Sequence, residues 1–338
     1  MEDNKLMKRK KAQTKLIRAI LSPEVGSLVF AIILTVIVAL NNNKFISVKN
    51  LLSILGNASF IGVVAIGQAL IIMSGEMDLS VGNCGGFACT VFGIMACWYD
   101  MPAWLAILGG LGVAVCVGFL NGFLMLKVGI MKWVATLATS NLCAGLALYF
   151  AHGVPISPLP DAIKTFGKIT INFGNNNKLS IHFLIFVGLV IVAELIIRYT
   201  KYGRMIQACG INSESASMAG VNVTRVKWIT LIFVSILSYT GTFLSNAKQG
   251  MVSPSGLAGA DFKTIASCYI GGIGFVGSSG SVLGLFLGVL LIQLLENAMS
   301  ALAWEANAQL CCIGLLVMFV LILDVFKRRY MASRIDLI

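Results

Sequence analysis

The feature that most constrains this chain is a series of long apolar runs. A helix needs about 20 apolar residues to cross a hydrocarbon core of roughly 30 Å, and ten stretches approach that length. They are Val25–Leu40, Leu51–Met73, Val81–Trp98, Ala103–Leu126, Trp133–Phe150, Leu179–Ile197, Trp228–Leu244, Phe262–Val276, Ser281–Leu302 and Ala308–Val325. They do not alternate apolar with polar residues as the strands of an outer-membrane barrel do. We expect an all-α integral membrane protein with about ten transmembrane helices.

The distribution of basic residues predicts how these helices are oriented. If ten helices alternate from a cytoplasmic N-terminus, 18 of the 25 lysines and arginines fall inside and seven outside. This bias follows the positive-inside rule. We expect basic cytoplasmic tails over residues 1–24 and 327–338 and one transmembrane domain over residues 25–326. The net charge of +11 then indicates contact with anionic membrane lipid rather than with nucleic acid.

Two of the connections between predicted helices are long, whereas most of the others are short. Residues 151–178 fall outside, and residues 198–227 fall inside. Within the inside loop, Asn212 can cap a short helix over Ser213–Ala219, and Gly220 can end it. Such a helix adds nothing to a membrane bundle, so we favour docking of another protein over an ordinary solvated loop. Added bulk at Ala216 is expected to block that docking and leave the fold intact.

Glycine is common inside the apolar runs. The pairs Gly118/Gly122 and Gly284/Gly288 form small-xxx-small faces, which let helix backbones approach closely. Around residues 271–281 the glycines are too dense for an ordinary helix. A broken or re-entrant segment is expected there, since irregular backbone is tolerated in a membrane only where protein or water satisfies it.

Two carboxylates, Glu76 and Asp78, follow the second apolar run directly. A carboxylate at the bilayer centre costs about 2.5–3.5 kcal/mol on insertion scales, so we place both at the cytoplasmic surface. Asp78 can cap the next helix. It can also order a loop against a partner or along a translocation path, and the residues alone leave these readings open.

No residue pattern in the chain indicates catalysis. There is no GxxxxGK[ST] loop for ATP, no metal-ligand cluster of cysteine and histidine, and no Ser/His/Asp arrangement. The nine cysteines are expected to pack as small apolar residues. Acids near or within the apolar runs are Glu194, Glu296 and Asp324. Glu296 keeps open a proton-coupled secondary carrier, because carriers use acids inside the membrane.

Uncharged amides are the candidates for a substrate path. Amide side chains donate and accept hydrogen bonds without the desolvation cost of ions, which suits a neutral, hydroxyl-rich solute. The candidates are Asn57, Gln68, Asn83 and Asn121. Hydrogen bonding between helices is the alternative role for each of them.

Three motifs give the chain a family resemblance. "SGEMDLSVG" resembles the GGIDLSVG stretch of the inner-membrane permeases of ABC importers for ribose and related monosaccharides. "GRMIQACGINSESASMAGVNV" is similar to their cytoplasmic coupling loop, and "IASCYIGGIGFVGSSGSVLGLFLGVLL" to a segment near their C-terminus. The motifs occur in the expected order, and the resemblance covers essentially the whole chain.

The resemblance implies a multi-pass translocation subunit of the bacterial cytoplasmic membrane that is not itself an enzyme. It implies cytoplasmic ABC ATPase subunits that carry ATP and magnesium, an extracytoplasmic solute-binding protein, and a second permease copy or paralogue. The implied ATPase-coupling positions in the loop 198–227, called the coupling loop below, are Gly203, Arg204, Ala208, Gly210, Asn212, Ala216 and Gly220. The other motif places Asp78, Leu79, Ser80 and Gly82 in a family loop.

The chain departs from the family pattern at several positions. Glu76 and Ile211 stand where glycine is usual, and Gly277–Ser278 replaces a Gly-Gly pair. Lys263 stands where aspartate is usual, on the predicted outer side. This last change leaves open a sugar-like signal molecule or a nucleoside as the solute. A non-transporting membrane receptor that uses the coupling loop as a platform is a further alternative.

Overall fold

The computed structural model describes residues 23–42, 44–174, 177–274, 280–305, 307–319 and 322. The elements are α2 (Pro23–Asn41), α3 (Val48–Met73), α4 (Val81–Gly93) with its π-helical continuation η1 (Ile94–Trp98), α5 (Ala103–Gly122) with η2 (Phe123–Val128), α6 (Lys132–Phe150), α7 (Asp161–Gly167), β1 (Thr170–Asn172), β2 (Lys178–Ser180), α8 (Ile181–Tyr199), α9 (Lys201–Ile211), α10 (Ser213–Met218), α11 (Val223–Gln249), α12 (Ala260–Ile270) and α13 (Val282–Ala301). A further helix covers Asn307–Phe319.

Seven helices are long and apolar enough to cross a membrane. They are α3, α4 with η1, α5 with η2, α6, α8, α11 and α13, and they correspond to seven of the ten predicted runs. The first run forms α2, in which only Ala31–Asn41 is described in full, and the tenth run and both basic tails lie partly or wholly outside the described residues. The count of ten and the cytoplasmic placement of both termini therefore stay predictions, whereas an integral membrane protein made mainly of helices is confirmed.

The eighth predicted run, Phe262–Val276, is not a full span. Its helix α12 has only 11 residues and ends at Ile270, which gives about 16 Å at 1.5 Å per residue, half of a hydrocarbon core. Residues 271–274 are outside any helix, and Gly272 has φ +82°. The predicted break near 271–281 is confirmed for these residues, and the remainder, with Gly277–Ser278, falls largely outside the described part of the chain.

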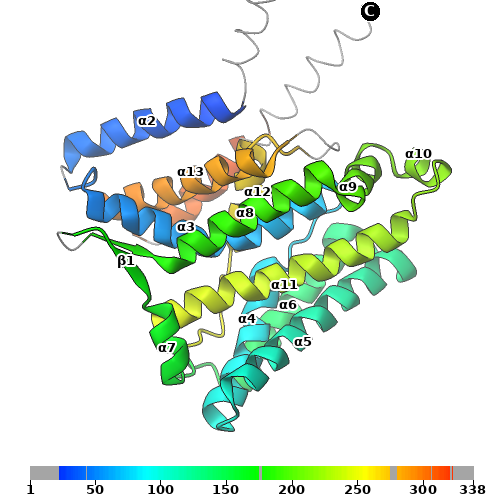
Figure 1. Ribbon diagram of the computed structural model, residues 1–338, viewed down its shortest axis with the longest axis horizontal. Coiled ribbons are helices and arrows are strands. Elements are labelled where there is room, and N and C mark those ends of the chain that lie inside the picture. Colours follow the sequence, from blue (N-terminus) through cyan, green and yellow to red (C-terminus); the bar gives the residue numbers. More distant parts are fainter. Residues whose placement is uncertain are drawn as a thin grey trace, which may run out of the picture.

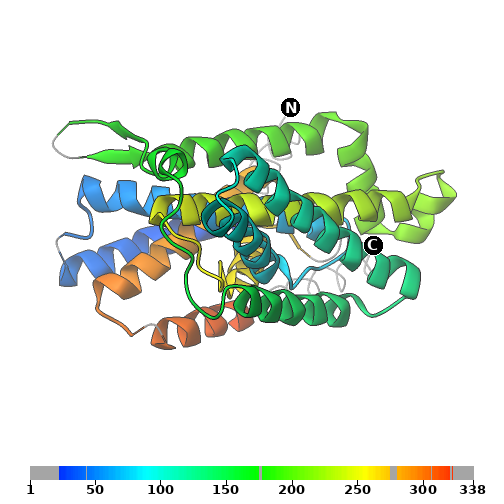
Figure 2. The same ribbon diagram turned by 90° about the horizontal axis from the view of Figure 1, so that it is seen from below.

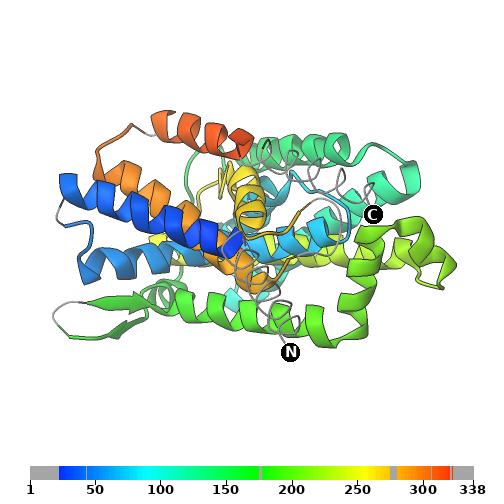
Figure 3. The same cartoon turned by 90° about the horizontal axis from the view of Figure 1, so that it is seen from above.

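The long helices run roughly side by side and separate the two long connections (Figure 1). The short helix α7 and the antiparallel pair β1–β2 lie at one end, and α9 and α10 lie at the opposite end. The other views show the same separation (Figures 2 and 3). Loops 151–178 and 198–227 therefore lie at opposite ends of the bundle, as the alternation of spans predicts. We call these the α7 end and the α9 end.

The core is centred on α3 and α11, which pack against each other. Within α3, 83% of the membrane-length window is buried, against 28% for α5 and 33% for α6 and α8, so α3 is the interior helix. Glycines permit its close contacts, because Gly62 faces the Phe186 ring of α8 and Gly67 faces the Val234 backbone of α11.

Both small-xxx-small pairs are helix contacts, as predicted. Gly118 and Gly122 of α5 pack on Ile232 and Trp228 of α11. Gly284 and Gly288 of α13 pack on the backbone carbonyls of Gly271, just after α12, and Ser267, within α12, where a Cβ would overlap the backbone. The absence of side chains at these four positions sets how closely the helices approach.

Gly288→Leu is expected to destabilise the bundle, because its side chain would overlap the Ser267 carbonyl of α12, which cannot rotate away. Overpacking costs about 1–3 kcal/mol, so the temperature of thermal unfolding in detergent should fall. Gly188→Leu is the control, since Gly188 of α8 has no neighbour within 4 Å and a mid-helix glycine already costs about 0.5–1 kcal/mol. Equal destabilisation in both variants would contradict this packing.

Candidate functional site

The coupling loop begins with a sharp corner between α8 and α9. Thr200 ends α8 and caps α9, where its hydroxyl accepts the Gly203 N–H at 3.1 Å. A Cβ on Gly203 would overlap the carbonyls of Ile196 and Ile197, so only glycine permits this corner. On the other side, the Tyr202 hydroxyl lies 2.9 Å from Thr230 Oγ1 and holds α9 against α11.

The helix α9 itself was not anticipated from the sequence. Its buried residues Gly203, Ile206 and Cys209 recur at a spacing of three, which is the helical signal that could have revealed it. Burial raises the pKa of the Cys209 thiol, so this cysteine packs as a small, neutral side chain.

The short helix α10 forms as predicted. The Asn212 side chain accepts the Ser215 N–H at 2.9 Å, and Gly220 takes φ +86° just after the helix. The helix ends at Met218, one residue before the predicted end, with Ala219 as its C-cap. It lies at the tip of the α9 end (Figure 1).

Most motif positions shape the coupling loop, and its most exposed large apolar side chains belong to other residues. Ile211, the last residue of α9, and Met218, the last residue of α10, are 61% and 81% exposed. By contrast, Ala216 is 5% exposed and points into the protein. Added bulk at Ala216 would therefore disturb the loop itself, so the expectation that it blocks docking without affecting the fold is wrong.

Three of the implied coupling positions are exposed, namely Arg204, Asn212 and Gly220. Ala208 and Gly210 are partly buried. Gly210 lies against the end of α3, because a Cβ built on Gly75 would be 3.4 Å from the Cα of Gly210. Gly75 has φ +78°, a conformation that glycine adopts without strain. The coupling loop therefore rests directly on the C-terminus of the central helix.

The end of α3 is fixed by a Schellman arrangement. The N–H groups of Gly75 and Glu76 donate to the carbonyls of Ile72 and Ile71, at 3.0 and 3.1 Å, which satisfies carbonyls that a helix end leaves free. Glu76 is thereby held to α3 through its own backbone.

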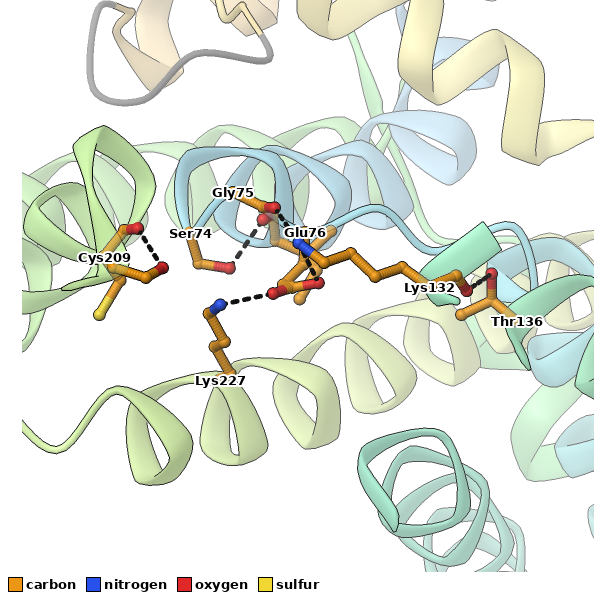
Figure 4. A network of polar contacts seen from close by, with 9 residues as sticks. Ser74, Gly75, Glu76, Lys132, Thr136, Cys209 and Lys227 are labelled. Carbon is orange, nitrogen blue, oxygen red and sulfur yellow. Dashed lines mark hydrogen bonds and ion pairs between the residues drawn. The ribbon is translucent and has the colours of Figure 1, made fainter. Parts of the chain in front are cut away.

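The Glu76 side chain joins three helices (Figure 4). Its Oε1 lies 2.6 Å from Lys227 Nζ in the first turns of α11, and its Oε2 lies 3.0 Å from Lys132 Nζ at the start of α6. Lys132 also donates to the Gly75 carbonyl at 2.9 Å. We call Glu76, Lys132 and Lys227 the Glu76 cluster. Glu76 is 2% exposed, so its placement at a solvated surface is wrong, and two lysines offset its burial instead.

Beyond Glu76, the chain enters the middle of the bundle before α4 begins. Positions 74, 76, 78 and 80 are buried and the three between them partly buried. The Ser238 hydroxyl donates to the Val81 carbonyl, and Ser238 is the sixteenth of the 27 residues of α11. The first residue of α4 therefore lies beside the midpoint of a full-length helix.

The family-loop residues gather in this interior. The N–H and the hydroxyl of Ser80 both donate to Asp78 Oδ1, at 2.7 and 2.6 Å. Asn121 Nδ2 of α5 donates to Ser80 Oγ at 2.9 Å and lies 3.5 Å from Asp78 Oδ2. Asp78 is 1% exposed, so the surface position proposed for it is also wrong. Leu79 is partly buried.

The cap of α4 comes from a distant residue, and sequence reasoning missed it. Gly82 N–H donates to Asp261 Oδ1 of α12 at 2.7 Å, whereas Asp78 binds Ser80, just before the helix. A Cβ on Gly82 would overlap the Leu257 carbonyl oxygen. In the sequence, Asp261 looks like the first-turn acid of its own helix, and nothing marks a partner 179 residues earlier.

The four candidate path residues do not converge. Asn83 Nδ2 donates to Ser140 Oγ of α6 at 2.9 Å, and Asn57 Oδ1 accepts from Lys248 Nζ at 2.9 Å. Gln68 is fully buried, and neither polar atom of its side chain has a partner within the described residues. Only Asn121 joins the family loop, so a substrate path through these residues stays a prediction.

Two of the three acids noted in the sequence have partners, and Asp324 lies outside the described residues. Glu194 Oε1 lies 2.6 Å from Arg198 Nε, and its Oε2 accepts the Val282 N–H at 2.7 Å. Glu296 Oε1 lies 2.5 Å from Lys263 Nζ of α12. Lys263 is therefore turned toward α13.

Comparisons with known proteins identify the family. A family model described as the permease component of branched-chain amino acid transport systems matches residues 50–321. The ribose import permease of Haemophilus influenzae is 28% identical over 308 residues, which cover 89% of this chain and 93% of that protein. The fructose import permease of Rhizobium meliloti is 28% identical over 301 residues, with 86% and 81% covered. The xylose transport system permease of Haemophilus influenzae is 25% identical over 328 residues, with 80% and 88% covered.

No solved structure matches the chain. The relatives include the monosaccharide import permeases that the three motifs led us to expect. Because the family model covers most of the chain, including α4 to α13, the protein belongs to the branched-chain amino acid transport system permease component family.

Proposed function

We propose that this chain is the membrane permease of an ATP-driven, binding-protein-dependent importer for a monosaccharide or a similar small polar solute. The relatives named for ribose, fructose and xylose support the solute class. The observation that carries the mechanism is the exposed α10 on a coupling loop that packs on α3 and α11. A partner bound there can act directly on the two central helices.

The division of roles follows from the two ends of the bundle. Cytoplasmic ABC ATPase subunits bind ATP and magnesium and dock at the α9 end, while the extracytoplasmic solute-binding protein delivers solute at the α7 end. A second permease, either a copy or a paralogue, completes the path in the bacterial cytoplasmic membrane. The chain itself translocates and does not hydrolyse ATP. A sugar-like signal molecule or a nucleoside would use the same machinery.

The pairing of Glu296 favours this importer over a proton-coupled carrier. A carrier needs an acid that gains and loses a proton during the cycle, whereas Glu296 is half-buried beside the ammonium group of Lys263 at 2.5 Å. The carboxylate is thus already engaged in an ion pair between α12 and α13.

Met218→Glu is expected to weaken binding of the ATPase by about 10- to 100-fold, because burying an apolar side chain of this size contributes about 1.5–3 kcal/mol. The permease should be expressed and folded normally, since Met218 is 81% exposed. Co-purification of the ATPase and ATP-driven uptake in proteoliposomes measure the effect. Met218→Leu keeps an apolar contact and is the matched control. Normal assembly and uptake with Met218→Glu would contradict docking at this face.

Glu296→Gln is expected to leave ATP-driven uptake within about twofold of wild type. Glutamine keeps the volume of the side chain, and its amide oxygen can still accept a hydrogen bond from Lys263 Nζ. Uptake should also be unaffected when an ionophore removes the proton gradient. Loss of uptake in Glu296→Gln, together with uptake by the chain alone driven by a proton gradient, would instead support the carrier.

A further inference from the structure

The Glu76 cluster lies where the coupling loop meets the bundle. Glu76 contacts Lys227 of α11 and Lys132 of α6, and its backbone belongs to the end of α3. Directly beside it, Gly75 packs on Gly210 of α9. Any displacement of α9 relative to α3 or α11 must therefore act on Glu76 and its neighbours.

From Glu76 the chain leads straight to the interior. Asp78 follows two residues later and binds Ser80, which is the N-cap of α4. Only residues 77–80 separate Glu76 from α4, and the hydrogen bonds of Asp78 and Ser80 fix their course. Asn121 of α5 is bound to the same segment through Ser80. A shift at Glu76 is thus passed to the start of α4 and to α5.

Stability alone does not explain why an acid occupies position 76. Buried ion pairs are often no more stabilising than apolar side chains of similar volume, and this chain spends only 12% of its residues on charge. An ion-pair cluster instead fixes which groups meet and where, because removal of one member leaves its partners without a counter-charge. Such fixed pairing suits a contact through which one helix moves another.

We propose that Glu76 is a positioning residue that transmits movement of the coupling loop to the buried start of α4, through its ion pairs with Lys227 and Lys132. This role rests on the proposed function, because it assumes that an ATPase moves the coupling loop. The role of Glu76 sets how much solute is moved for each ATP hydrolysed. Glu76 is buried and does not belong to the exposed α10 face proposed for ATPase docking.

The test uses the full complex of permease, ATPase and binding protein in proteoliposomes. Uptake of radiolabelled ribose, fructose or xylose and hydrolysis of ATP are measured together, and the readout is solute taken up per ATP hydrolysed. In Glu76→Gln this ratio should fall at least about fivefold, the lower range of typical coupling between distant sites. Glu296→Gln removes a carboxylate from an ion pair elsewhere in the chain and should leave the ratio unchanged.

The ratio separates transmission from general damage. A purely structural role would lower the amount of active complex, so uptake and hydrolysis would fall together with an unchanged ratio, and that result would overturn the proposal. If Glu76→Gln does not assemble, Lys132→Gln replaces it. The Lys132 side chain is 50% exposed, which makes its loss tolerable for folding, and the ratio should still fall. An unchanged ratio in that variant would also overturn the proposal.

Transport by the wild-type complex distinguishes failure of the proposed function from failure of the role of Glu76. If wild-type complex shows no ATP-driven uptake of any of these sugars or of a nucleoside, the proposed function fails and the role of Glu76 fails with it. If wild-type complex transports and Glu76→Gln transports with the same ratio, only the role of Glu76 fails.

Discussion

The arrangement depends on one constraint: helices that begin inside a membrane bundle need acceptors for their first N–H groups. Water satisfies such groups at a surface, but an unsatisfied group in an apolar interior costs several kcal/mol. Here the start of α4 is bound by Asp261 and the start of α13 by Glu194. Each acid is also stabilised by the positive end of the helix dipole. These two carboxylates are therefore placed where backbone groups would otherwise lack partners.

Both of these acids also join segments that are far apart in the sequence. Asp261 is 179 residues from Gly82, and Glu194 is 88 residues from Val282. Lipid supplies no hydrophobic drive that would hold helices together, so such polar contacts and close packing at glycines determine which helices associate. The interior start of α4 is possible only because the half-length α12 brings Asp261 to it. The irregular backbone near α12 is thus part of how the bundle is assembled.

The sequence predicted what depends on local pattern and missed what depends on distant partners. Seven long helices, the small-residue contacts and the capped α10 all follow from hydropathy, glycine spacing and capping residues close in the chain. The partners of Glu76, the role of Asp261 and the buried course of residues 74–80 do not. A carboxylate after an apolar run has the same local pattern whether water or a lysine on another helix offsets it. The sequence therefore placed Glu76 at a surface, and the structure buries it.

The coupling loop shows why a motif match and a binding face need not consist of the same residues. Gly203 permits the α8–α9 corner, Gly210 permits contact with Gly75, and Asn212 and Gly220 begin and end α10. Each role demands a residue type, because a larger side chain would overlap backbone or a different one would lose the cap. No such demand applies to Ile211 and Met218, which are exposed in this chain. The motif therefore specifies a shape that a family can share, while the exposed face can be matched to a particular ATPase without disturbing that shape.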